Sequence, residues 1–375
     1  MAYREIIDNL CDAGLHPART IGKTKKETGK DLVGCFPYHT PDEIIYAAGC
    51  IPVALWGGNT EIQKADKYLQ GFCCGLLRAN VEFSLSGAYD GLKAIIIPTF
   101  CDSLKCTLEN MKLTAKCPVI GMAYPQQRKL QAGIDFAVSE FERVRHELEK
   151  ITGRIISEQM VEDAFEVYED YRAAMRAFTE VAAAYPDIIT AKKRQMIIKA
   201  GQFMDKAEYT KAIKEITEGL KKETPKPYKG KKVIVTGLMT EPVEILDIFE
   251  ENDIAIVGDE MSLGSRQWRT PARRDVTDVY QRMAYMVADQ KGDTFLYEPE
   301  KLRGQIMIDD VKAEKADGIV IFMMKFCDPE EYDYPIYKKE VEAAGVPMLY
   351  LEVDQQLNSF EQIRTRIQSF NEMLI

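Results

Sequence analysis

The sequence predicts an α/β protein with two domains, each built on a parallel sheet, and a helical connector between them. Two stretches far apart in the chain, 90–102 and 317–328, share one pattern: an Asp-Gly turn, an apolar strand and then Phe-Cys-Asp. In each half a helix and another apolar strand follow the cysteine, which is the layout of a parallel βαβ unit. Residues 134–222 show almost no strand signal but have long amphipathic stretches typical of helices. We therefore expect two related Rossmann-like or flavodoxin-like domains with a cleft between them.

Chain length and punctuation divide the sequence further. At 375 residues the chain is long for a single hydrophobic core, so two domains are the natural expectation. Prolines at 225 and 227 and a glycine at 230 mark the start of the second half, because such residues interrupt regular structure. We expect a helical lead-in at 1–30, a first α/β domain at 31–133, the connector at 134–227 and a second α/β domain at 228–375.

The first half is predicted to alternate helices and strands. Thr40 is a suitable N-cap, Pro41 suits the first helical position and Glu43 completes a Thr-x-x-Glu capping box, so a helix is expected from there to Gly49. Cys35 falls in a glycine loop before this helix. The other expected elements are a strand at 51–56, a helix at 74–86, a strand ending before Cys101, a helix at 103–113 and a strand at 119–123.

The second half repeats this alternation and ends in a helix. Its expected strands lie at 232–237, at 254–259, before Cys327 and at 347–352. Its expected helices lie at 242–252, 278–290 and 335–344, and a C-terminal helix closes the domain.

Composition excludes several classes of function. The net charge of -10 argues against nucleic acid as the main partner. No apolar run reaches the ~18–20 residues of a membrane span. The chain begins MAYREIIDNLCDAG, which lacks the apolar core of a signal peptide, so we expect a cytoplasmic protein. The sequence contains neither the Gly-x-Gly-x-x-Gly fingerprint nor a P-loop, so we expect no usual dinucleotide site and no ATP hydrolysis by this chain.

The nine cysteines are not expected to form disulfides, because the cytosol keeps thiols reduced. Free thiols in such a protein indicate a metal or redox centre. Cys101 and Cys327 stand alike, each just past the carboxyl end of a buried strand, where open α/β sheets bind ligands. Cys74 lies at a helix start, which lowers the pKa of a thiol and favours the metal-binding thiolate, although Cys73 competes with it. The alternative is that these cysteines are small buried hydrophobes. Neither the usual Cys-x-x-Cys cluster spacing nor a Cys/His zinc pattern is present.

Two further polar features have plain structural interpretations. Arg266, Arg269, Arg273 and Arg274 form a basic cluster, for which a solvated loop is favoured over a phosphate site. His39 precedes the first capping box, and we expect the backbone to satisfy its hydrogen bonds rather than a ligand.

Several motifs in order along the chain resemble the 2-hydroxyacyl-CoA dehydratase and benzoyl-CoA reductase family. They are the stretch 40–53, Cys74-x-x-x-Arg78, Cys101-Asp102, Phe326-Cys327-Asp328, and the stretches 345–347 and 351–354. The resemblance implies one [4Fe-4S] cluster held by Cys74, Cys101 and Cys327, with a non-protein ligand at the fourth iron. Cys35 is left out because the family cysteine of that motif lies slightly closer to the proline. Relatives often carry a cysteine near Met261, and its absence here argues against a redox role for the segment 259–266.

The likeness is greatest to the smaller, β subunits of the dehydratases of amino-acid fermentation in anaerobes. It implies a heterodimer with an α subunit that holds most of the 2-hydroxyacyl-CoA substrate, and an ATP-dependent iron–sulfur activator that supplies one electron. The implied reaction converts (R)-2-hydroxyisocaproyl-CoA to a 2-enoyl-CoA and water through a ketyl radical, with phenyllactyl, lactyl and glutaryl substrates left open. This chain would relay electrons, and no catalytic side chain is named. The alternatives are a subunit of a CoA-thioester reductase of the benzoyl-CoA reductase or double-cubane type, and a metal-free scaffold.

Overall fold

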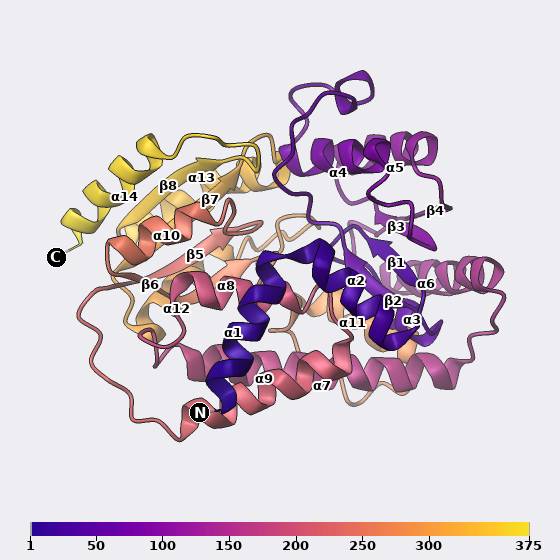
Figure 1. Cartoon of the computed structure of the whole chain (residues 1–375), viewed down its shortest axis with the longest axis horizontal. Coiled ribbons are helices and arrows are strands. Elements are labelled where there is room, and N and C mark those ends of the chain that lie inside the picture. Colours follow the sequence, from indigo (N-terminus) through magenta and orange to yellow (C-terminus); the bar gives the residue numbers. More distant parts are fainter. Residues whose placement is uncertain (1, 375) are drawn as a thin grey trace.

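The computed structural model describes residues 2–374, which form two parallel sheets surrounded by helices (Figure 1). The first sheet has the strand order β2-β1-β3-β4 and the second the order β6-β5-β7-β8, with every pair parallel. The strands are β1 (Leu32–Cys35), β2 (Ile51–Ala54), β3 (Ala94–Pro98), β4 (Val119–Met122), β5 (Lys231–Gly237), β6 (Ile254–Met261), β7 (Gly318–Met324) and β8 (Met348–Val353). The two halves thus share one topology, and the predicted α/β fold is confirmed.

Helices cover both sheets and fill the stretch between them. The first half contributes α1 (Ala2–Leu15), α2 (Pro17–Thr28), α3 (Asp42–Ala47), α4 (Gly75–Ser86) and α5 (Asp102–Thr114), with a short 3-10 turn η1 (Ala65–Lys67). Between the sheets come α6 (Gln131–Thr152), α7 (Glu158–Ala182), α8 (Ala191–Ala200) and α9 (Lys206–Lys221). The second half contributes η2 (Ser265–Gln267), α10 (Glu244–Glu251), α11 (Val279–Asp289), α12 (Arg303–Glu314), α13 (Asp328–Ala343) and α14 (Glu361–Met373). Figure 1 shows the two sheets side by side, with α7 and α9 along the lower edge.

The two halves share buried clusters of side chains. One cluster includes Ile95 of β3, Phe322 of β7 and Met175 of α7. A second joins Ile96 of β3 to Met283 of α11, a helix from the second half that contacts α6 and α7. Strands β3 and β7 are buried along their whole length, which explains why they are almost continuously apolar. Because packing spans both halves, it fixes the end of one sheet relative to the end of the other.

Strand β1 is an element that the sequence analysis assigned to a loop. It pairs with both β2 and β3 inside the first sheet, and Cys35 at its end is buried. A Cβ atom at Gly34 would lie 2.8 Å from Leu92 Cδ1 and 3.0 Å from Leu55 Cδ1, so a larger residue would force these leucine side chains to shift. Four residues with a glycine among them give a weak strand pattern, which is why the element escaped prediction.

The predicted capping box at Thr40 is wrong. Helix α3 begins at Asp42 with Pro41 as its N-cap residue. The hydroxyl of Thr40 instead donates to the carbonyl oxygen of Phe36 at 2.5 Å. Glu43 does not reach back to the helix start either, because its carboxylate pairs with the buried guanidinium of Arg172. A long-range ion pair therefore replaces the expected local one.

Helix α13 begins at Asp328, earlier than the expected start at 335. Cys327 is its N-cap residue, and Pro329 lies in the first turn, where a missing N–H costs no hydrogen bond. Pro335 lies inside the helix rather than at its start. The earlier start is functionally relevant because it places Cys327 directly at the amino end of a helix.

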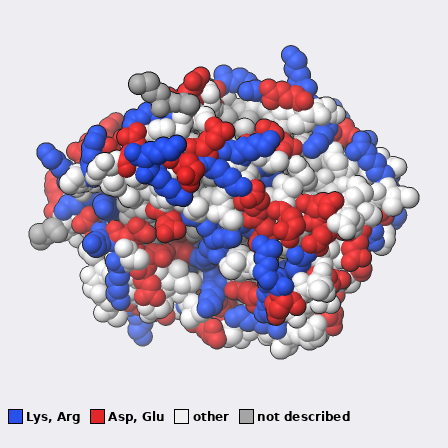
Figure 2. Space-filling view, turned by 90° about the horizontal axis from the view of Figure 1, so that it is seen from below, with Lys and Arg blue, Asp and Glu red and all other residues white. Residues whose placement is uncertain are grey.

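The surface is mixed in charge. Figure 2 shows Lys and Arg side chains interspersed with Asp and Glu over the face seen from below. Among residues 2–374, no helix combines the length and the apolar character needed to cross a bilayer.

Candidate metal centre

The structure brings the three predicted ligand cysteines to one place. Cys74, Cys101 and Cys327 are the N-cap residues of α4, α5 and α13. Cys101 and Cys327 follow β3 and β7, which are corresponding strands of the two sheets. All three line a single cavity of about 60 Å³. Because the amino end of a helix carries partial positive charge, three helices favour negative charge at this point.

The walls of this cysteine cavity are mainly apolar and come from both halves of the chain. Phe36, Trp56 and Phe100 line it from the first half, and Leu238 and Phe295 from the second. The rings of Phe100 and Phe295 lie 4.8 Å apart, centroid to centroid, and so join the two halves. Such walls offer few polar groups, which lowers the local dielectric and strengthens electrostatic interactions inside the cavity.

Without a bound metal the three thiols hold their protons. Burial raises the pKa of Cys327 well above its usual value and that of Cys101 to about 11. A hydrogen bond with Cys73, together with burial, raises the pKa of Cys74 in the same way. The expected lowering of the Cys74 pKa by its helix is therefore wrong for the metal-free chain. Repulsion between thiolates adds to two of these shifts, because a thiolate at Cys327 would raise the pKa of Cys74 and one at Cys101 would raise that of Cys327.

The donors at the cysteine cavity are thiols, the donor type that iron–sulfur clusters use. Within the described range 2–374, no three His, Cys, Asp or Glu side chains are close enough to hold one metal ion. A cube-shaped iron–sulfur cluster spaces its ligands more widely, because each thiolate binds a different iron atom. Thiolates are the preferred ligands of such clusters, and their binding would displace the thiol protons. The buried Cys74 and Cys327 and the half-buried Cys101 line one apolar cavity, and thiolates are the donors that a [4Fe-4S] cluster would need there.

The other cysteines divide into a neighbour and a scattered group. Cys73 is buried beside Cys74, and its hydrogen bond with Cys74 lowers its pKa. Cys35 and Cys50 are buried in the first half, whereas Cys106 on α5 is exposed. Cys73 is thus the one competitor that lies near the cavity, as the sequence analysis anticipated.

A strained loop closes one side of the cysteine cavity. Tyr38 and His39 both have positive φ angles, 77° and 62°, which non-glycine residues rarely adopt. His39 Nε2 lies 2.9 Å from a carboxylate oxygen of Asp293, and Arg128 lies 3.4 Å from the same oxygen. Although burial alone would raise it, pairing with His39 and Arg128 lowers the pKa of Asp293. A carboxylate from the second half, not the backbone as expected, therefore satisfies the His39 ring and fixes this loop.

A second, polar cavity of about 140 Å³ lies on the other side of this loop, and Pro37 and Tyr38 line both cavities. Asp42 and Lys206 line it too, and burial raises the pKa of Asp42 to about 6 and lowers that of Lys206. The hydroxyl of Tyr168, a further lining residue, is buried without a hydrogen-bond partner among the described residues. The sequence analysis missed this cavity, for which the adjacent acidic residues at 42 and 43 were the one available signal.

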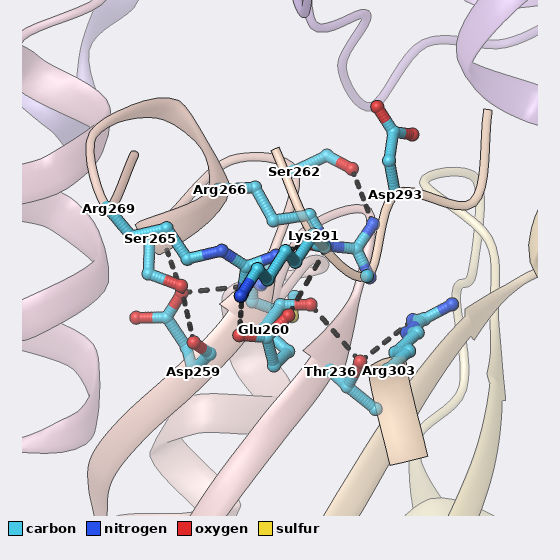
Figure 3. A network of polar contacts seen from close by, with 12 residues as sticks. Thr236, Asp259, Glu260, Ser262, Ser265, Arg266, Arg269, Lys291, Asp293 and Arg303 are labelled. Atoms are coloured by element: carbon cyan, nitrogen blue, oxygen red, sulfur yellow. Dashed lines mark hydrogen bonds and ion pairs between the residues drawn. The ribbon is translucent and has the colours of Figure 1, made fainter. Parts of the chain in front are cut away.

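The basic cluster at 266–274 is not a uniformly solvated loop. Figure 3 shows Arg266 and Arg269 directed into a network of polar residues at the end of β6. Arg266 is buried, with its Nη1 3.0 Å from Glu330, and Arg269 pairs with Glu260. Arg273 and Arg274, which are more exposed, pair with surface carboxylates. The prediction of a solvated side chain is therefore wrong for Arg266, because this side chain is buried and pairs with carboxylates.

Comparison with known proteins gives a family match over most of the chain. A family model described as 2-hydroxyglutaryl-CoA dehydratase, D-component, matches residues 37–374. This span contains all three cavity cysteines, the whole second sheet and every strand of the first sheet except β1.

Similar proteins cover the chain from end to end. The (R)-phenyllactyl-CoA dehydratase beta subunit of Clostridium sporogenes is 42% identical over 99% of this chain and 97% of its own length. The lactoyl-CoA dehydratase subunit beta of Anaerotignum propionicum is 42% identical over 98% of each chain. The (R)-2-hydroxyglutaryl-CoA dehydratase subunit beta of Acidaminococcus fermentans is 35% identical over the full length of both.

Proposed function

Since this chain belongs to the 2-hydroxyglutaryl-CoA dehydratase D-component family, we propose that it is the β subunit of an iron–sulfur 2-hydroxyacyl-CoA dehydratase and relays an electron. In this proposal Cys74, Cys101 and Cys327 hold one [4Fe-4S] cluster. The observation that carries it is the convergence of these cysteines, from three helix starts in both halves, on one apolar cavity.

The chain's own residues prepare the cavity for a negatively charged group. Helices α4, α5 and α13 direct their amino ends at it, which stabilises thiolates once their protons are displaced. The N–H of Leu104 lies 3.4 Å from Cys101 Sγ and donates to it, and hydrogen bonds of this kind tune cluster potentials. Aromatic side chains form much of the cavity wall. A cluster bound there would supply a one-electron reservoir of low potential.

The proposed reaction is the loss of water from a (R)-2-hydroxyacyl-CoA, for which we take (R)-2-hydroxyisocaproyl-CoA as the candidate substrate. The named relatives act on phenyllactyl, lactoyl and 2-hydroxyglutaryl thioesters, so subunits of one fold serve acyl groups of different size and polarity. We propose that selectivity lies mainly with an α subunit, and that an ATP-dependent iron–sulfur activator supplies the electron that generates a ketyl radical of the substrate.

The ligand assignment is tested by replacing one cysteine at a time. The chain is co-expressed with a dehydratase α subunit and purified without oxygen. Cys101→Ser is expected to remove the iron of this chain, about four atoms, because a hydroxyl is a poor ligand for such a cluster. Cys106→Ser is the matched control on the same helix, since Cys106 is exposed and should leave the iron unchanged. Full iron content in the Cys101 variant would reject the assignment.

Activity is tested by adding the components separately. Dehydration is expected only when the α subunit, the activator, ATP and a reductant are all present, with the four candidate thioesters compared. Dehydration by this chain alone would contradict the proposed relay. Net reduction of a thioester instead of water loss would indicate a reductase, and an iron-free complex would indicate a scaffold.

A further inference from the structure

A cluster of buried ion pairs involves the first turn of α13, the helix whose N-cap residue is Cys327. Glu330 in the first turn of α13 is held from two sides, with Arg266 Nη1 3.0 Å from one carboxylate oxygen and Arg303 Nη2 2.5 Å from the other. Arg303 also donates to the hydroxyl of Thr236 on β5 at 2.8 Å, as Figure 3 shows. The side chains of Arg266 and Glu330 are 0% exposed. Burying these charged side chains costs desolvation free energy, so stability alone does not explain why the ion cluster lies here.

The contacts of Arg266 link this cluster to the cysteine cavity. Glu330 follows the N-cap residue Cys327 by less than one helical turn, so fixing its carboxylate fixes the start of the helix. On its other side, Arg266 Nη1 lies 3.2 Å from the hydroxyl of Ser262, which lines the cysteine cavity. One guanidinium group therefore joins a wall of the cavity to the turn that carries one of its thiols.

Arg266 forms ion pairs with Glu330 and Glu260, but its hydrogen bonds are incomplete. Its Nε lies 3.8 Å from Glu260, beyond hydrogen-bond distance, and within residues 2–374 Nε and Nη2 have no hydrogen-bond partner. Glu260 is also paired with Arg269. A positive charge in a dry interior acts over longer distances than one at the surface. It would favour any process that adds negative charge to the neighbouring cavity.

We propose that Arg266 is a positioning residue that holds Cys327 and the cavity wall in place and whose charge stabilises the reduced form of the bound cluster. This inference rests on the proposed function. It assigns a role in cluster potential to a residue that neither lines the cysteine cavity nor contacts a cysteine directly. The reduced cluster carries one more negative charge than the oxidised one, so a buried cation nearby raises the midpoint potential.

The experiment compares three variants of the anaerobically purified complex. Arg266→Gln removes the charge, and Arg266→Lys keeps the charge but, without the planar guanidinium, cannot contact Ser262 and Glu330 in the same geometry. Arg273→Gln is the control, because Arg273 belongs to the same loop and pairs with Asp289 away from the cavity. Iron content, the EPR line shape of the reduced complex and its midpoint potential are measured. The signal of this chain is identified by its loss in Cys327→Ser.

Arg266→Gln is expected to shift the potential of this cluster to more negative values and to change its line shape. Arg266→Lys is expected to keep the potential and change the line shape, whereas Arg273→Gln should match the wild type in both. A folded Arg266→Gln variant with wild-type potential and line shape would overturn the inference. If that variant does not fold, a folded Arg266→Lys variant with wild-type iron and line shape would overturn it. Wild-type complex without iron would instead overturn the proposed function, and the inference with it.

Discussion

Asp42 provides a quantitative test of the polar cavity beside the cysteine site. Burial raises the pKa of this carboxyl from 3.8 to about 6. The folded-state pKa of Asp42 lies above its unfolded-state value, so the folded chain binds this proton more tightly. Its contribution to the free energy of unfolding is complete below pH 3.8 and is lost as the pH rises through about 6. The difference between these two values corresponds to about 3 kcal/mol at neutral pH.

Asp42→Asn removes this penalty, since the amide carries no charge. The variant is therefore expected to be more stable than the wild type above pH 7, by at most about 3 kcal/mol. This limit already includes the attraction of buried Lys206, which lowers the pKa of Asp42. At pH 4 the two proteins should be nearly equal, because Asp42 is then largely protonated when folded.

The assay is thermal unfolding followed by circular dichroism at pH 4 and at pH 7.5. For a chain of this size each kcal/mol moves the midpoint by about 2 °C or less, so the expected rise at pH 7.5 is a few degrees. Asp135→Asn, at an exposed position on α6, is the control and should change neither midpoint. A variant that is less stable at pH 7.5, or equally shifted at both pH values, would refute the reasoning.

Two further predictions concern buried contacts that hold the halves in place. Arg172→Met should destabilise the protein by about 3–5 kcal/mol, because it leaves the buried carboxylate of Glu43 unpaired. The control Arg143→Met, on the exposed side of α6, should cost much less in the same thermal melt. Equal losses of stability in the two variants would contradict the buried pairing. Phe322→Ala should cost about 3–5 kcal/mol of stability by opening a cavity at fully buried β7. The control Leu113→Ala, at a side chain that is 75% exposed, should be nearly neutral in denaturant unfolding. A small loss of stability in Phe322→Ala would argue against the packing described.

The sequence predicted those features that depend on local pattern. The two Phe-Cys-Asp stretches follow fully apolar strands, and burial on both faces makes such strands easy to identify. The common position of Cys101 and Cys327 follows from topology, because carboxyl ends of parallel strands meet at one edge of a sheet. Cys74 was identifiable as a helix start, and it is the N-cap residue of α4.

Features that depend on contacts between distant segments could not be predicted from the sequence. Thr40 and Glu43 matched a capping box locally, but Arg172 in a remote helix takes the carboxylate. The sequence predicted a solvated Arg266, but its side chain is buried and paired with Glu330. The pKa of Cys74 followed the same rule, since the neighbouring Cys73 and burial outweigh the helix end. In each case tertiary contacts override a local preference.

The central claim is that three cysteines from both halves of the chain hold one iron–sulfur cluster. The most direct measurement is the iron and acid-labile sulfide content of the anaerobically purified complex, with Mössbauer spectra, for wild type and Cys327→Ser. The account predicts that the Cys327→Ser complex contains about four iron atoms fewer than the wild type while keeping its helical content and its α subunit. Equal iron and sulfide in the two complexes, or a wild type without iron, would contradict it.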